Sequence, residues 1–196
     1  KGASKGEGLG NKFLSHIREV DAIIHLVRCF ESEKITHVSS NINPVEDLET
    51  IKTEIILSDI DIIQKKLEKG KKKILEEKQI KILEEKLNQL NQGKEISVND
   101  VDDKKFLYSL GLLSIKPKII VCNVDEGSLA KGNTFTEEVK KKYSNEKVVT
   151  ICADIEDQIM DLDKSERQTF MKEIGLDKTG LNQLIKEGYE LLNLDT

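Results

Sequence analysis

One apolar run near the middle of the chain passes directly into polar residues, in the stretch Lys118-Ile119-Ile120-Val121-Cys122-Asn123-Val124-Asp125-Glu126. Two other runs have the same apolar, β-branched character, at Ala22–Phe30 and at Val148–Cys152. Such runs are typical of strands in a parallel sheet that helices cover on both faces. We therefore predict three buried strands, the first of them buried on both faces.

The segment between the first two runs has a different periodicity. Apolar residues between Glu46 and Lys69 recur mostly at intervals of three and four, which predicts a long helix with one apolar stripe: Leu48, Ile51, Ile55, Ile56, Ile60, Ile63 and Leu67. Gly70 stands where a glycine commonly ends a helix. A second helix is predicted up to about Gln92, with the stripe Ile80, Leu83, Leu87 and Leu90. Two such helices joined at a glycine favour an antiparallel coiled-coil hairpin.

Helix signals also accompany each strand. Ser97 with Asp100 resembles a capping box that opens a helix as far as Leu110, and further helices are expected near residues 11–19, 137–143, 164–174 and 181–192. Strands that alternate with helices on both sides of a hairpin are typical of an α/β domain with a helical insertion. We assign residues 1–44 and 112–196 to the α/β domain and residues 45–111 to the insertion.

Composition narrows the classes of protein. Of the 196 residues, 34% are charged and the formal net charge is −5, which argues against general attraction to nucleic acid, specific DNA or an anionic membrane. No apolar run approaches the roughly 20 residues of a membrane span, and no signal-peptide pattern occurs. The three cysteines are far apart and lack metal or redox spacing, so we expect reduced thiols in a cytoplasmic protein and no metal site among these residues.

The ends of two predicted strands carry the residues of chemical interest. Asn123 and the acidic residues up to Glu126 follow the second strand, and Cys152-Ala153 follows the third. Ligands of open α/β sheets bind at the carboxyl ends of parallel strands. There a side-chain amide and a carboxylate could face the edge of a purine, while Cys152 and Ala153 offer backbone N–H groups. From the residues alone the simpler alternative stays open, because Asn and Asp commonly form turns.

The first nineteen residues resemble the switch II segment of Obg-type GTPases: Lys1-Gly2-Ala3-Ser4-Lys5-Gly6-Glu7-Gly8-Leu9-Gly10-Asn11-Lys12-Phe13-Leu14-Ser15-His16-Ile17-Arg18-Glu19. The run Val27-Arg28-Cys29-Phe30-Glu31 and the helical hairpin are similar to the Obg-like ATPase (YchF) branch in particular. The similarity continues through residues 113–117, 152–156, 180–182 and 188–194, and so covers nearly the whole chain.

This resemblance implies part of a P-loop nucleotide hydrolase, or G domain. The phosphate loop, switch I and the Mg²⁺ ligands would lie upstream of Lys1, and a TGS domain would follow Thr196. No Gly-x-x-x-x-Gly-Lys-[Ser/Thr] motif occurs in the sequence. We therefore expect a central fragment that is inactive by itself, and whose first strand exposes an apolar edge where the phosphate-loop strand would pair.

The base-recognition loop departs from the usual GTPase pattern Asn-Lys-x-Asp, because here it reads Asn123-Val124-Asp125-Glu126. Glu126 is one methylene longer than the Asp that binds guanine, and Val124 lacks the Lys stem that covers the ring. Losing a buried bidentate pair costs on the order of 1–3 kcal/mol. The resemblance therefore implies ATP at least as good a ligand as GTP, with the backbone of Val124 facing the adenine edge.

Two further features are interpreted through the resemblance. His37 matches the loop histidine proposed to position the attacking water in this branch, and an ordinary loop histidine is the equal alternative. Around Gly70 lies a group of lysines, which we call the tip lysines: Lys65, Lys66, Lys69, Lys71, Lys72 and Lys73. The family's association with ribosomes implies a contact with ribosomal RNA, while a solvated helix end is the simpler alternative. A non-catalytic helical-hairpin interaction module is the second hypothesis for the function.

Overall fold

The computed structural model describes residues 9–33, 35, 41–70 and 75–194. By packing, the chain forms two compact units, one of Lys1–Asp21 with Glu49–Lys116 and one of Ala22–Leu48 with Pro117–Thr196. We call them the helical unit and the sheet unit. The predicted domain assignment, with boundaries at residues 44 and 112, stays a prediction.

The sheet unit is built on three parallel strands, β1 (Ile23–Arg28), β2 (Lys118–Asn123) and β3 (Lys147–Ile151), in the order β1-β2-β3. Ile23 pairs with Lys118, and Ile119 pairs with Lys147. Each strand lies within or next to a run predicted from apolar β-branched residues. The predicted parallel α/β fold is therefore confirmed.

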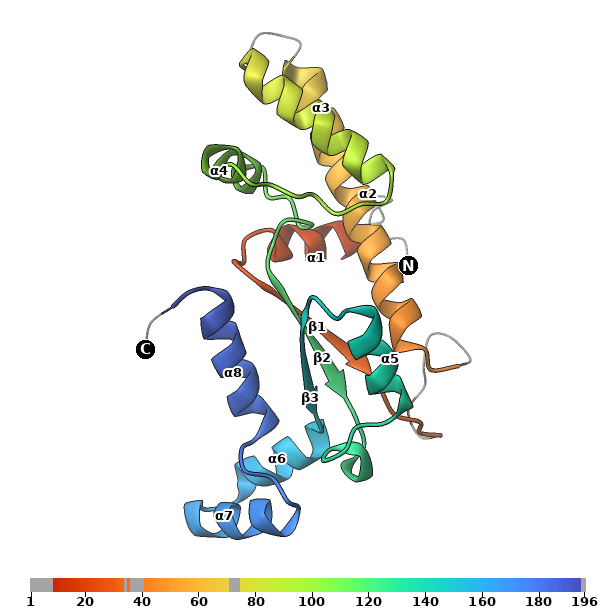
Figure 1. The fold of residues 1–196 in the computed structure, drawn as a ribbon, viewed down its shortest axis with the longest axis vertical. Helices are drawn as coiled ribbons and strands as arrows, with labels where there is room; N and C mark the ends of the chain where they lie inside the picture. Colours follow the sequence, from red (N-terminus) through yellow and green to blue (C-terminus); the bar gives the residue numbers. More distant parts are fainter. Residues whose placement is uncertain (1–8, 34, 36–40, 71–74, 195–196) are drawn as a thin grey trace. The chain divides into compact units, whose positions relative to one another are not determined.

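Helices cover the two faces of this sheet (Figure 1). On one face Ile119, Val121 and Val149 pack against Leu184 and Leu191 of α8 (Gly180–Leu191). The other face packs against α5 (Thr134–Lys142), whose Val139 is fully buried in a cluster with Ile120 and Cys122. Two shorter helices, α6 (Ala153–Asp161) and α7 (Lys164–Glu173), connect β3 to α8.

The first strand departs from the prediction that both of its faces are buried. Val27 is buried, but Ile24 is 54% and Leu26 is 62% exposed. Both residues pair in register with Ile119 and Val121, so they lie on the face of the sheet that α8 covers. Because α8 packs over β2 and β3, nothing described covers that face of β1. The continuous apolar pattern predicts that both faces of this strand favour burial. It does not predict which segment covers each face.

The helical unit contains α1 (Leu9–Ile17), most of α2 (Pro44–Gly70), α3 (Glu77–Asn91) and α4 (Val101–Ser109). The helices α2 and α3 lie side by side as a hairpin (Figure 1), with Ile56, Ile63, Leu83 and Leu90 buried in one cluster with Leu107 of α4. Ile51 of the predicted stripe is instead 49% exposed.

The start of α4 also differs from the predicted capping box. Asp100 itself is the N-cap residue and accepts hydrogen bonds from the backbone N–H groups of Asp102 and Asp103. The Ser97 carbonyl accepts a hydrogen bond from the ammonium group of Lys86. An aspartate at the cap position satisfies the first amides directly.

A buried carboxylate joins distant parts of the helical unit. Asp59 of α2 is fully buried and accepts hydrogen bonds from the backbone amides of Leu113 (3.0 Å) and Ser114 (2.8 Å). The Arg18 guanidinium lies 3.4 Å from the same carboxylate and donates to the Gly111 carbonyl at 2.6 Å. A buried charge with such partners is costly to disrupt, because removing one partner leaves the other unpaired.

Close packing at Gly180 provides a test of the sheet unit. A Cβ atom at Gly180 would lie 2.6 Å from Cγ2 of Ile151, whereas one at Gly188 would meet nothing within 4 Å. We expect Gly180→Ala to lower the free energy of unfolding by about 1–3 kcal/mol through overpacking. Gly188→Ala lies on the same helix and is expected to be neutral or stabilising by up to about 1 kcal/mol. Thermal unfolding followed by circular dichroism measures both, and equal losses of stability would contradict the packing described.

Candidate functional site

The carboxyl ends of β2 and β3 are joined by two hydrogen bonds. The backbone N–H of Val124 donates to the Ile151 carbonyl at 2.8 Å. Next to this bond, the backbone N–H of Ala153, two residues beyond Ile151, donates to the side-chain oxygen Oδ1 of Asn123 at 3.0 Å. The loops at 123–126 and 152–156 therefore meet at one end of the sheet, where parallel α/β sheets bind ligands.

The end of β1 belongs to the same assembly. The backbone N–H of Cys29 donates to the Asn123 carbonyl at 2.7 Å, and the Cys29 carbonyl accepts a hydrogen bond of 2.7 Å from Nδ2 of Asn133. Asn133 is also the N-cap of α5, where it forms a capping box with Thr136. Sequence reasoning missed Asn133 as a support of the site, since its only local signal is that of a helix cap.

In the base-recognition loop, Val124 and Asp125 form hydrogen bonds within the protein, whereas the side chain of Glu126 is exposed to solvent. Val124 is buried, and its N–H donates to the Ile151 carbonyl, so this N–H is not available to a ligand. Asp125 accepts a hydrogen bond from the Ser128 N–H at 2.9 Å and thereby caps a short 3₁₀ turn, Glu126–Ser128. Glu126 is exposed, and among the described residues its carboxylate has no hydrogen-bond partner or ion pair. The acidic side chain available to a ligand is therefore the fourth residue of the loop.

The third-strand loop is less open than expected. Of its two predicted backbone donors, the N–H of Ala153 is already bonded to Asn123. Cys152 is buried, and this burial raises the pKa of its thiol, with the nearby charges of Asp154 and Glu126 acting in the same direction. The thiol therefore stays protonated at neutral pH.

The remaining predicted site residues are not brought to this site by the described structure. His37, Lys71, Lys72 and Lys73 lie outside the described residues, as does the side chain of Lys69. Lys65 is exposed and forms an ion pair of 2.6 Å with Asp61 one turn away on α2, and Lys66 is half-buried.

The described part of the chain contains neither a candidate metal site nor a candidate membrane-spanning helix. None of its groups of His, Cys, Asp and Glu side chains could hold a metal ion. None of its helices combines the length and the apolar character needed to cross a membrane.

Two curated proteins that are similar to this chain carry the same name. The chain is 41% identical over 207 aligned residues to the ribosome-binding ATPase YchF of Bacillus subtilis, covering 100% of this chain and 57% of that protein. It is 43% identical to the ribosome-binding ATPase YchF of Mycoplasma pneumoniae, covering 99% of this chain and 57% of that protein. The chain thus spans a little over half the length of these relatives. No family model matches it.

A solved structure agrees with the sequence comparison. The YchF GTPase of Schizosaccharomyces pombe superposes with a TM-score of 0.84 at 28% sequence identity, over 96% of this chain and 54% of that one. The fold of this chain is thus similar to that of a YchF GTPase over nearly its whole length. From its sequence and its fold together, the chain belongs to the Obg-like ATPase (YchF) family.

Proposed function

We propose that this chain is the base-binding part of a nucleotide hydrolase that binds ATP, and also GTP, and works on ribosomes in the cytoplasm. The similar proteins of Bacillus subtilis and Mycoplasma pneumoniae are named ribosome-binding ATPases, and the similar solved structure is a GTPase. The observation that carries the proposal is the hydrogen bond between Ala153 and Asn123, which joins the two loops at the sheet's ligand-binding end.

The groups left free at this end suit adenine. With its N–H used, the backbone of Val124 offers a carbonyl acceptor. Adenine carries an exocyclic amino donor that can pair with such an acceptor, whereas guanine carries a carbonyl at the same position. Glu126 can still accept from guanine donors, but its longer side chain fits them less rigidly than Asp. The loop therefore supports binding of both purines without a strong preference for guanine.

Phosphate and Mg²⁺ binding are assigned to segments outside this chain. The sequence holds no phosphate-loop motif, and no group of residues in the described part could hold a metal ion. In P-loop hydrolases, Mg²⁺ bridges the nucleotide phosphates and neutralises charge that develops during phosphoryl transfer. We therefore propose that turnover needs the rest of the protein and that the isolated chain does not hydrolyse nucleotide.

Nucleotide preference tests the base site directly. In the full-length protein we expect ATP to bind at least as tightly as GTP, and Glu126→Asp to shift the GTP-to-ATP affinity ratio toward GTP. A gain of about 1 kcal/mol from a better-placed carboxylate corresponds to roughly fivefold. Glu138→Asp makes the same chemical change at an exposed position on α5 and serves as the control. Competition binding measures the ratios, and a hundredfold preference of the unaltered protein for GTP would refute the assignment.

A role of His37 in hydrolysis is a separate proposal, since this residue lies outside the described structure. An imidazole that positions or polarises the attacking water contributes to turnover but not to nucleotide binding. We expect His37→Ala in the full-length protein to lower stimulated hydrolysis about a hundredfold and to leave nucleotide affinity unchanged. His16→Ala, at an exposed position of α1, is the matched control. Unaltered turnover in His37→Ala would remove this residue from the mechanism.

The tip lysines are proposed to contact ribosomal RNA phosphates. Each phosphate contact made by a cation steepens the dependence of affinity on salt by roughly one unit of log–log slope. Glutamine replacement of Lys69, Lys71, Lys72 and Lys73 is therefore expected to weaken ribosome binding and flatten that slope. Lys164→Gln with Lys172→Gln, on exposed positions of α7, is the control. Co-sedimentation with ribosomes across a salt series measures both, and an unchanged slope would leave a solvated helix end as the explanation.

The alternative of a non-catalytic hairpin module makes a different prediction for the same protein. It requires ribosome binding that is independent of nucleotide, with no turnover by the full-length protein. The joined strand ends at Asn123 and Ala153 favour the hydrolase, because a pure scaffold needs no open polar edge at that place.

A further inference from the structure

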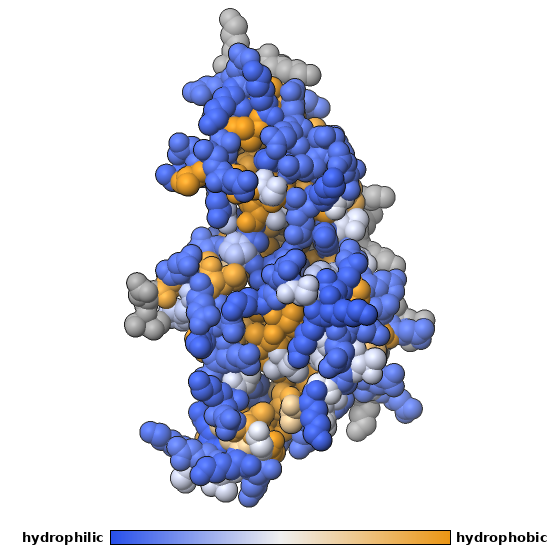
Figure 2. All heavy atoms as spheres, in the orientation of Figure 1, coloured by the Kyte–Doolittle hydropathy of each residue, from blue (hydrophilic) through white to orange (hydrophobic). Residues whose placement is uncertain are grey.

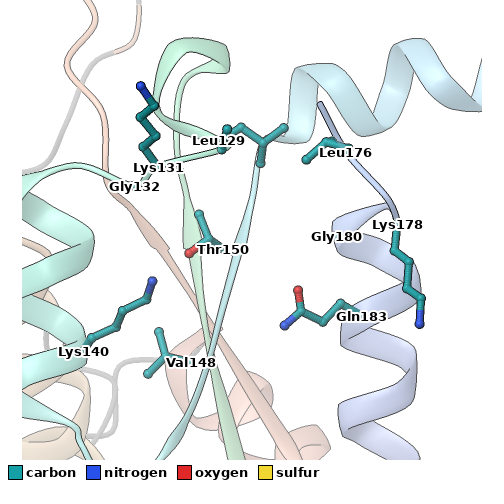
Figure 3. Close-up of a pocket in the computed structure, with 11 residues that line it drawn as sticks. Leu129, Lys131, Gly132, Lys140, Val148, Thr150, Leu176, Lys178, Gly180 and Gln183 are labelled. Atoms are coloured by element: carbon teal, nitrogen blue, oxygen red, sulfur yellow. The ribbon is translucent and has the colours of Figure 1, made fainter. Parts of the chain in front are cut away.

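A cavity of about 270 Å³ lies beside β3 (Figure 3). Lys131 and Lys140 border it on the side of α5, and Leu176, Lys178 and Gln183 border it on the side of α8. Val148 and Thr150 of β3 line it between them. In the space-filling view, apolar surface lies over the strands between α5 and α8, with hydrophilic side chains on either side (Figure 2).

The strand that lines this cavity is at an edge of the described sheet. The strand order β1-β2-β3 leaves one side of β3 without a described neighbour. Ile151 directs its carbonyl toward β2, where it accepts from Val124. Because backbone groups alternate in direction along a parallel strand, Val148 and Thr150 direct theirs to the open side. The cavity therefore contains backbone N–H and C=O groups suited to pairing with another strand.

One side-chain group in the cavity also needs a partner. The hydroxyl oxygen of Thr150 is buried and has no hydrogen-bond partner in the described structure. On the other side of β3, the side-chain amide of Gln183 points toward the strand (Figure 3). Buried polar groups are normally satisfied. A ligand that lies along β3 would reach both groups.

The positive charge of the cavity lining indicates a ligand with negative charge. Its described lining contains three exposed lysines, Lys131, Lys140 and Lys178, and no acidic residue, in a chain with a net charge of −5. None of the three lysines forms an ion pair with a described carboxylate. Their ammonium groups are spread over both sides of β3 rather than converging on one point (Figure 3). This arrangement fits an extended anion better than a single small one.

We propose that the cavity binds an extended acidic peptide segment of a partner protein, which adds to the sheet as a strand beside β3. Its backbone pairs with the open groups of Val148 and Thr150. Successive side chains of a strand point to opposite faces, so its acidic residues meet Lys131 and Lys140 on one face and Lys178 on the other. Peptides commonly bind exposed sheet edges in this way. A second copy of this chain is disfavoured, because its lysines would face those of the first.

The experiment uses the full-length protein and the acetylated, amidated peptide Val-Glu-Glu-Val-Glu-Glu-Val, which carries acidic residues on both faces of an extended strand. We expect saturable binding with chemical-shift changes at the backbone amides of Val148 and Thr150. Replacing every Glu by Lys, or methylating alternate backbone nitrogens to block strand pairing, is expected to weaken binding at least tenfold. Equal binding of either control peptide would overturn the proposal, as would full competition by inorganic phosphate, which would indicate a small-anion site.

Charge reversal in the protein gives a matched comparison. Lys140→Glu combined with Lys178→Glu is expected to lower the affinity for the acidic peptide at least tenfold. Lys141→Glu combined with Lys172→Glu makes the same change in charge at two exposed residues that do not line the cavity, and is expected to change affinity less than twofold. Similar losses in both variants would indicate general attraction and overturn the proposal. ATP affinity, measured alongside, is expected to stay unchanged, so this result is independent of the proposed nucleotide site.

Discussion

The backbone amide of Val124 donates to the carbonyl of Ile151, and this last bond between β2 and β3 fixes the position of both strand-end loops. It sets the register in which Asn123 stands beside Ile151, so that the backbone amide of Ala153, two residues further on, reaches the Asn123 side chain. The close contact of Gly180 with Ile151 then holds the start of α8 against the same strand end. A shift of one residue in this register would turn each side chain of the strand to the opposite face of the sheet.

The same bonds that build the site also limit what it can offer to a ligand. Two of the backbone donors nearest the strand ends are used in holding the loops together, those of Val124 and Ala153. The exposed carboxylate of Glu126 remains available as a hydrogen-bond acceptor. Discrimination between purines then depends on where the base presents its donors, which differs between adenine and guanine.

Much of this structure could be predicted from sequence, and the failures have identifiable causes. Apolar periodicity located the strands and the hairpin, and the rule for parallel sheets brought the two loops together. Periodicity could not reveal that Ile24 and Leu26 lack a cover, because it reports a preference for burial and not the neighbour that provides it. Nor did any local signal indicate the buried Asp59, whose partners lie 41 residues away at Arg18 and 54 residues away at Leu113. The use of the Val124 and Ala153 amides was likewise hidden, since it depends on strand register.

The central claim is that the loops at 123–126 and 152–156 together hold the purine. Photoaffinity labelling of the full-length protein with 8-azido-ATP, followed by peptide mapping, tests it most directly because the azide sits on the base itself. We predict label in peptides that contain residues 123–129 or 152–156, and protection of both by unlabelled ATP. Saturable, ATP-protected label confined to other segments would contradict the assignment.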